Sequence, residues 1–351
     1  GRGIPPPAGD RARSRERDSA MALLTFLARR IARLVISLLI VSMLAFGLLQ
    51  LAPGTFAGIQ AVGGGSTGLA NQQTSGNNSA LVQAYGENVP IPVQYWNWLS
   101  HAVVGDFGPS YKYPQSDVTE IIAQALPVTA SLAFFAMVLA LAIAIPVGVI
   151  SAVRRGTWID NSLMFVSTLG VAIPNYLMAI ILVLVFSVGL HALPTGGWTG
   201  PQSMIMPVIA LGAGMAGVFA RYVRSSVLEV LDEEYVVAAR ARGGTPRAVL
   251  LRHVLRSAIM PLVTVAGPAF AGLIAGTLFV EQIFGIPGLG QYFTQAAIGR
   301  DMPLMMGCTV VFAAILMAMN VIVDLVYAAI DPRTRAGLGL SHETKRKAAV
   351  A

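Results

Sequence analysis

Long apolar segments alternate along this chain with shorter segments that carry nearly all of its charge. Hydrophobic residues make up 55% of the 351 residues, and charged residues only 12%, about half the share found in soluble domains. A helix of about 20 apolar residues is long enough to cross the hydrocarbon core of a bilayer. The chain is therefore predicted to be a polytopic membrane protein rather than a soluble domain with a large core.

Six apolar runs are predicted to cross the membrane as helices. The first follows a cluster of arginines, is long for the core of a signal peptide, and lacks a small-residue cleavage site. We expect a short interfacial helix over Asp117–Ala125, after which Pro127 introduces the second span, and we expect Pro174 to kink the third. The six predicted spans are Leu34–Leu51, Val128–Val153, Ser162–Leu190, Met204–Val223, Leu262–Val280 and Leu304–Ile330.

The basic residues predict the orientation of these spans. All but two of the 24 Lys and Arg residues fall on one side of the six predicted crossings, and the exceptions are Lys112 and Arg300. By the positive-inside rule, both termini and the charged segment between the fourth and fifth spans lie in the cytoplasm. The same asymmetry accounts for the net charge of +7 without a nucleic-acid partner, and no RNA- or DNA-binding motif is present.

Changes in composition divide the chain into four regions. Residues 1–20 are polar and rich in Pro and Arg, and we predict a disordered tail. Residues 21–127 hold the first span and an extracytoplasmic region with the low-complexity insert Gly63–Ser79. Residues 128–330 are expected to form a core of five transmembrane helices, and residues 331–351 a basic cytoplasmic tail.

Segment 232–261 is too highly charged to enter the membrane, yet it has clear helix signals. Burying its eight charges would cost on the order of 20 kcal/mol. Asp232 is a good N-cap, and the two glutamates that follow are favoured in the first turn of a helix. Gly243-Gly244 is expected to end this helix, and Thr245-Pro246 to cap and begin a second one. Two short helices joined by a Gly-Gly turn predict a docking surface for another protein.

This segment resembles the EAA loop of ABC importer permeases, the cytoplasmic coupling segment that seats in an ATPase subunit. Val237-Ala238-Ala239 followed by Gly243 carries the resemblance, and the string from Tyr235 to Pro261 is similar to the oligopeptide/dipeptide branch. Val237 stands where the name of the motif puts Glu, and His253 and Arg256 stand where many members have Ile and Pro. The resemblance implies an ATPase-coupling role for Glu234, Tyr235, Ala238, Ala239, Arg240, Gly243, Gly244, Arg247 and His253.

The resemblance covers roughly Met21–Arg335 and implies an all-α type I ABC importer permease with six transmembrane helices in a bacterial plasma membrane. It also implies partners: a second, similar permease, two cytoplasmic ATPases, an extracytoplasmic substrate-binding protein and membrane lipid. Di- or oligopeptides would pass between the two permeases. Nickel, glutathione or another small solute remain alternative cargoes, and an ion-coupled secondary carrier or a membrane scaffold remain alternative functions.

No catalytic residue, metal site or cofactor is expected. The four histidines fall on separate segments, and no G-x-x-x-x-G-K-[ST] loop is present, so ATP hydrolysis is expected to belong to partner subunits. The single cysteine, Cys308, is expected to be a buried free thiol. Asp324 is expected to reach water or a basic group rather than to couple ions, and Glu281 to lie in a solvated outer loop. The small-residue pair Gly272 and Gly276 could pack within this subunit or against another.

Overall fold

The computed structural model describes residues 8–51 and 89–330, with side chains described from residue 28 to residue 322. These ranges are almost entirely helical, and they contain an isolated bridge between Pro109 and Asp117 but no strand. The all-α prediction is therefore confirmed for the described residues. The insert Gly63–Ser79, the tail 331–351 and the side chain of Asp324 lie outside the described part of the chain.

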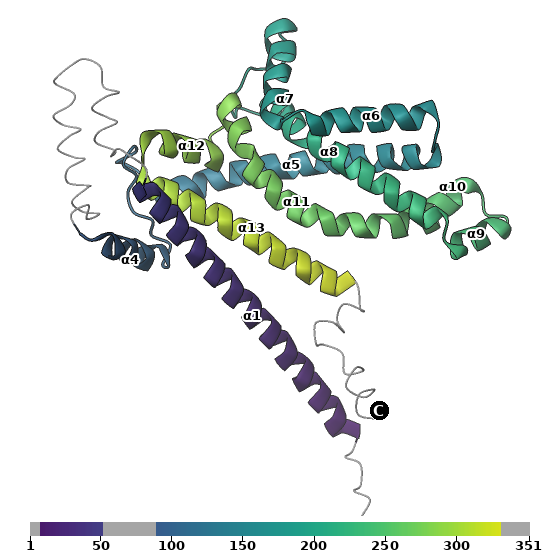
Figure 1. The fold of residues 1–351 in the computed structure, drawn as a ribbon, viewed down its shortest axis with the longest axis horizontal. Helices are drawn as coiled ribbons and strands as arrows, with labels where there is room; N and C mark the ends of the chain where they lie inside the picture. The colour runs from purple at the N-terminus through teal and green to yellow at the C-terminus, as the bar shows by residue number, and fades with distance from the viewer. Residues whose placement is uncertain (1–7, 52–88, 331–351) are drawn as a thin grey trace, which may run out of the picture.

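Five long helices build the molecule, and shorter elements join them. The long helices are α1 (Ala8–Leu51), α5 (Val118–Val153), α8 (Pro201–Leu231), α11 (Leu255–Phe284) and α13 (Met302–Ile330). Helix α8 packs along α5 on one side and along α6 (Trp158–Ala172) on another (Figure 1). The remaining elements are α4 (Ile91–Ala102), α7 (Asn175–Leu182), the π-helical segment η1 (Val183–Gly189), α9 (Glu234–Ala241), α10 (Pro246–Val249), the π-helical segment η2 (Leu250–Val254) and α12 (Leu289–Gly299).

Within residues 8–51 and 89–330, five helices are long and apolar enough to cross a membrane, and α6 with the α7–η1 segment makes a sixth crossing if that bent pair counts as one span. This agrees with the six predicted spans. Figure 1 shows α9 and α10 at one end of the bundle formed by α5, α8 and α11, and α12 at the opposite end. The charged loop and the outer loop therefore lie at opposite membrane faces, as the distribution of Lys and Arg predicts.

The prediction of disorder for residues 1–20 is wrong where the structure describes them, because α1 begins at Ala8. Helix formers such as Ala, Arg, Glu, Leu and Met dominate this stretch, and no Gly or Pro interrupts it between Gly9 and Gly47. The polar stretch therefore continues the helix of the apolar span that follows.

The sequence also predicts an interfacial helix separate from the second span, but the structure has one continuous helix here. Helix α5 is continuous from Val118 to Val153 and contains both Pro127 and Pro146. Proline removes one backbone hydrogen bond, but membrane helices tolerate this loss when neighbouring groups satisfy the freed carbonyls.

At Pro174 the chain breaks rather than kinks. Helices α6 and α7 meet at 100°, and Ile173 between them is extended, with φ −85° and ψ 117°. The ring of a proline disfavours helical angles in the residue before it, which explains why the break falls at Ile173. Helix α7 consequently leaves the direction of α6, as Figure 1 shows.

The buried apolar residues form two clusters. The larger joins α5, α8 and α11 and extends to Val236 and Ala239 in α9 and Val249 in α10. The smaller joins the outer ends of α5, α12 and α13, and it contains Cys308, a free thiol that is fully buried as expected.

Candidate functional site

The loop between α8 and α11 has the two-helix form that the sequence predicts, with a one-residue shift at its start. Glu233 rather than Asp232 is the N-cap of α9, and Asp232 instead ends α8. The turn after α9 depends on Gly243, whose φ of +85° is a left-handed conformation that glycine adopts without strain. The side-chain oxygen of Thr245 accepts a hydrogen bond from the backbone N–H of Ala248, and Pro246 is the first residue of α10, as predicted.

Gly244 allows α9 and α10 to meet closely. Its N–H donates to the carbonyl oxygen of Ala239 at 3.2 Å. A Cβ atom at this position would lie 2.9 Å from that oxygen and 2.9 Å from the side chain of Val249. No larger residue fits here without movement of the backbone, so Gly243 supplies the turn and Gly244 supplies the close approach.

One face of the loop is part of the protein core. Val236, Ala239, Val249 and Val254 are buried among the apolar residues of α8 and α11. The hydroxyl of Tyr235 also donates to Ser257 Oγ at 3.0 Å, which joins α9 to α11. The helix pair is therefore fixed to the bundle rather than suspended from it.

The opposite face is exposed and combines apolar and basic side chains. Val237 is 55% exposed and Leu251 is 64% exposed, although both are large apolar residues. Of the residues predicted to couple to an ATPase, all except Ala239 are exposed: Glu234, Tyr235, Ala238, Arg240, Gly243, Gly244, Arg247 and His253. The buried side chain of Ala239 faces the core, so its place in the site is to let α9 pack closely. Val237 and Leu251 were not among the predicted site residues. In the sequence, the feature that could have identified them is their apolar character within a charged segment.

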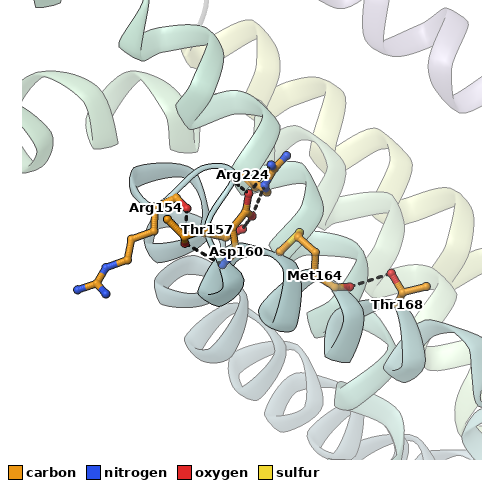
Figure 2. A network of polar contacts seen from close by, with 8 residues as sticks. Arg154, Thr157, Asp160, Met164, Thr168 and Arg224 are labelled. Carbon is orange, nitrogen blue, oxygen red and sulfur yellow. Dashed lines mark hydrogen bonds and ion pairs between the residues drawn. The ribbon is translucent and has the colours of Figure 1, made fainter.

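A partly buried ion pair fixes the inner part of α8, the helix that precedes this loop. Arg224 of α8 donates from Nε and from a terminal nitrogen to the two carboxylate oxygens of Asp160 in α6, each at 2.8 Å. The hydroxyl of Ser151 and the N–H of Gly156 donate to the same carboxylate. Figure 2 shows Asp160 and Arg224 converging, with Thr157 beside them at the start of α6. The contact joins the end of α5, the start of α6 and α8.

The sequence alone does not pair Asp160 with Arg224. They lie 64 residues apart in the sequence, and only the packing of α6 against α8 brings them together. The informative signal was that each charge sits where an apolar run meets the inner boundary, on helices that can be neighbours. A bidentate pair of this kind fixes the orientation of two helices as well as their distance.

At the outer end the structure overturns the prediction for Glu281. This residue is 0% exposed, at the end of α11, rather than in a solvated loop. Its carboxylate accepts hydrogen bonds from Thr129 Oγ1 at 2.7 Å, from the N–H of Gly290 at 2.7 Å and from the N–H of Gln291 at 3.1 Å. The last two donors belong to the first turn of α12, where free N–H groups and the helix dipole favour a negative charge. Glu281 is therefore buried because it caps α12.

A second buried carboxylate fixes the same end. Asp301 accepts hydrogen bonds from Ser110 Oγ, from the N–H of Lys112 at 3.0 Å and from the N–H of Leu304 at 3.2 Å. It thereby joins the start of α13 to the segment that precedes α5.

Tyr113 lies near this carboxylate, and its hydroxyl donates a hydrogen bond to Gln295 in α12. Burial raises the pKa of Tyr113, and the neighbouring Tyr292 and Asp301 raise it further.

The small residues of α11 lie in different surroundings. Gly276 accepts a hydrogen bond at its carbonyl oxygen from Asn175 Nδ2 at 3.1 Å, so this position packs within the subunit. Gly272 is exposed, and a Cβ atom at this position would have open space around it. Within the described residues, no group of three or more His, Cys, Asp or Glu side chains is arranged to hold a metal ion.

Comparison with known proteins assigns this architecture to a family. Residues 144–336 match the family of binding-protein-dependent transport system inner membrane components, and residues 23–133 match the N-terminal region of such components. The chain is similar to a solved structure of the MetNI methionine ABC transporter in inward-facing conformations, with a TM-score of 0.53 at 21% identity. That match covers 60% of this chain and 96% of the other, and it supports the fold.

Curated relatives match over nearly their whole length. The oligopeptide transport system permease protein OppB of Escherichia coli K12 is 37% identical over 316 residues, covering 89% of this chain and 100% of the relative. The dipeptide transport system permease protein DppB of Bacillus subtilis is 34% identical over 314 residues, covering 88% and 97%. The chain belongs to the family of inner membrane components of binding-protein-dependent transport systems, the permease subunits of ABC importers.

Proposed function

We propose that this chain is a permease subunit of a peptide importer in a bacterial cytoplasmic membrane. The similarity to oligopeptide and dipeptide permeases over their full length supports peptides as the cargo. Its partners in this proposal are a second permease of the same kind, two cytoplasmic ATPases and an extracytoplasmic binding protein. The peptide crosses between the two permeases, and the ATPases supply the free energy.

The coupling site is the exposed face of α9, Gly243-Gly244 and α10. One observation carries this assignment: the exposed face is backed by buried residues that belong to the transmembrane core. From Pro246 to Phe284 the chain is helical throughout its 39 residues, so α10, η2 and α11 follow one another without a break. A force applied to α10 is therefore transmitted along α11 to the outer end of the bundle.

The chemistry of this face defines what it binds. Val237 and Leu251 offer apolar surface, and the exposed side chains of Arg240, Arg242 and Arg247 add positive charge to the same segment. An ATPase that receives this loop needs an apolar groove with an acidic rim. Closure of two ATPases around ATP then draws the loops of the two permeases together and switches the spans between inward-facing and outward-facing states.

Transport by the purified complex in vesicles tests this function. Complexes that contain the chain and its co-purifying subunits are reconstituted with the binding protein outside, ATP trapped inside, and labelled di- and oligopeptides. We expect uptake that requires ATP and is lost with Val237→Asp, which places a carboxylate against the acidic rim. The matched control is Gln282→Asp, an exposed position at the outer end of α11.

The other possible results separate the alternatives. ATP-dependent uptake of nickel or glutathione without uptake of peptides would keep the ABC permease and replace the cargo. Uptake that follows an ion gradient after ATP is depleted would overturn the coupling role. The absence of any ATP-consuming subunit from the purified complex would overturn it as well.

A further inference from the structure

We propose that the groove between α5 and α6 binds an anionic phospholipid of the inner leaflet, with one acyl chain in the groove and the headgroup at the α5–α6 turn. The groove contains a cavity of about 350 Å³, within the range of small-molecule binding sites. The cavity opens onto the surface of the helix bundle, because the side chains of Val166 and Leu169 in its wall are 64% and 44% exposed.

The groove exists because its floor is made of small residues. Helix α8 contributes Ala213, Ala216, Gly217 and Ala220. The α6 and α8 backbones approach closely there, and a Cβ atom on Gly170 of α6 would lie 3.2 Å from the carbonyl oxygen of Ala213. Helix α5 packs against α8 but makes few contacts with α6, so no side chain fills the space between them.

The lining selects an apolar occupant. Ser167 is the one lining residue with a polar side chain, and the walls consist of aliphatic residues such as Ile143, Val147 and Leu163. A water molecule in such a space would have almost no hydrogen-bond partners. A hydrocarbon chain makes no hydrogen bonds in the bilayer, so it gives up none on entering the groove.

The depth of the cavity corresponds to the inner leaflet. Ile143 and Val147 precede Arg154, at the inner end of α5, by 11 and 7 residues. At 1.5 Å per helical residue, these positions lie about 16.5 and 10.5 Å from the inner boundary, so the cavity lies in the inner leaflet, whose hydrocarbon is ~15 Å thick, and extends to the bilayer centre. An acyl chain whose headgroup lies at that boundary reaches the cavity.

The α5–α6 turn supplies the headgroup contacts. Arg154 and Arg155 end α5 and are exposed, and Figure 2 shows the side chain of Arg154 directed away from Asp160. Asp160 is the one acid in residues 154–160, and Arg224 pairs with it. The turn therefore presents net positive charge to the membrane surface. Trp158, 76% exposed, follows directly, and tryptophan is favoured at the level of the headgroups. This charge favours an anionic over a zwitterionic phospholipid.

Photolabelling of the complex in nanodiscs tests the site. The probes are phosphatidylglycerol and phosphatidylcholine with a diazirine in the acyl chain, and mass spectrometry of peptides covering 161–178 reads the attachment. We expect phosphatidylglycerol to label this region at least about fivefold more than phosphatidylcholine, the factor that one arginine near an anionic headgroup supplies. The double variant Arg154→Gln/Arg155→Gln should lower phosphatidylglycerol labelling to the phosphatidylcholine level. Its matched control, Arg252→Gln/Arg256→Gln, also removes two exposed arginines, neither of which is assigned to the ATPase contact, and should leave the labelling unchanged.

Two cavity-filling variants keep the test independent of folding defects. Ala213→Leu fills the floor and Ile173→Trp fills the outer end, and either should abolish labelling by both lipids. Equal labelling by the two lipids, or labelling that survives both variants, would overturn the proposal. A photoreactive amino acid at Val166 provides a third readout, because attachment to a second protein chain rather than to lipid would show that a subunit covers the groove.

Discussion

At the outer end of the bundle, Glu281 is fully buried and meets only neutral donors, whereas at the inner end Asp160 meets the guanidinium of Arg224. The donors to Glu281 come from a hydroxyl and from the first turn of α12, so this carboxylate fixes an outer loop to the bundle. Asp160 instead joins two membrane helices, and the α9–α10 loop is held by apolar packing and by the hydrogen bond from Tyr235 to Ser257 rather than by a carboxylate.

The difference shows how one helical bundle serves two purposes. The outer end uses its carboxylates to make loops rigid, because buried backbone N–H groups need acceptors. The inner end uses a carboxylate to align helices, and the basic and apolar face of its loop remains exposed for a partner. The largest losses of stability should therefore come from the outer end, and the largest losses of coupling from the inner end.

Removal of the Glu281 carboxylate should have the largest effect on stability. Glu281→Ala leaves Thr129 and two backbone N–H groups without their acceptor in a buried position, and we expect a loss of about 3 kcal/mol in the free energy of unfolding. Unfolding of the detergent-solubilised protein by sodium dodecyl sulfate measures this loss. The exposed neighbour gives the control, since Gln282→Ala should change stability by less than about 0.5 kcal/mol. A similarly small change for Glu281→Ala would remove the distinction between the two ends.

Breaking the inner ion pair should cost somewhat less. Arg224→Ala leaves Asp160 buried without its cation, and we expect a loss of about 2 kcal/mol, because Arg224 is 28% exposed and water can partly replace it. The double variant Asp160→Ala/Arg224→Ala should lose less than the sum of the two single variants, which is the signature of direct coupling. Strictly additive losses in this cycle would show that the two side chains act independently.

The turn after α9 should respond to a single methyl group. Gly243→Ala forces an L-residue into a left-handed conformation, and we expect about 1 kcal/mol of destabilisation. Faster hydrogen exchange at the amides of 234–249 would report this loss locally. Gly272→Ala is the matched control, because that glycine is helical and has open space at its Cβ position, so alanine should be neutral or stabilising. Equal responses at the two glycines would argue against a special turn.

The two adjacent alanines of α9 should separate stability from coupling. Ala238→Leu places bulk on the exposed face and should change stability by less than about 0.5 kcal/mol while reducing peptide-stimulated ATP hydrolysis. Ala239→Leu overfills the core and should destabilise by about 1–3 kcal/mol. Unfolding and ATPase assays on both variants measure the contrast. If Ala238→Leu were as destabilising as Ala239→Leu, or left ATP hydrolysis unchanged, the exposed face would not be the contact.

Features set by local chemistry could be predicted from the sequence. The apolar runs predict the long helices, and Gly243, Thr245 and Pro246 predict the turn between α9 and α10 with residue accuracy. These features depend on hydrophobic length, on left-handed backbone angles and on helix capping, each of which operates within a few residues.

Features that depend on distant partners could not be predicted. Glu281 reads as a loop residue because its acceptor role appears only when α12 and Thr129, 152 residues away, pack around it. The pairing of Asp160 with Arg224 needs the contact of α6 with α8. At Pro174 the sequence predicts a kink. The size of the bend depends on the packing of α7, so the observed angle of 100° could not be predicted from the sequence. The sequence also does not show which of Ala238 and Ala239 faces the core.

Cross-linking from α9 tests the coupling role most directly. Ala238→Cys introduces an exposed thiol, and the native Cys308 is fully buried, so a membrane-impermeant bifunctional reagent should react at the introduced position alone. We predict a cross-link from this cysteine to an ATP-hydrolysing subunit in inside-out vesicles and none in right-side-out vesicles. Reaction only from the outer side, or no cross-link to any ATPase in the intact complex, would contradict the assignment of this loop as the coupling site.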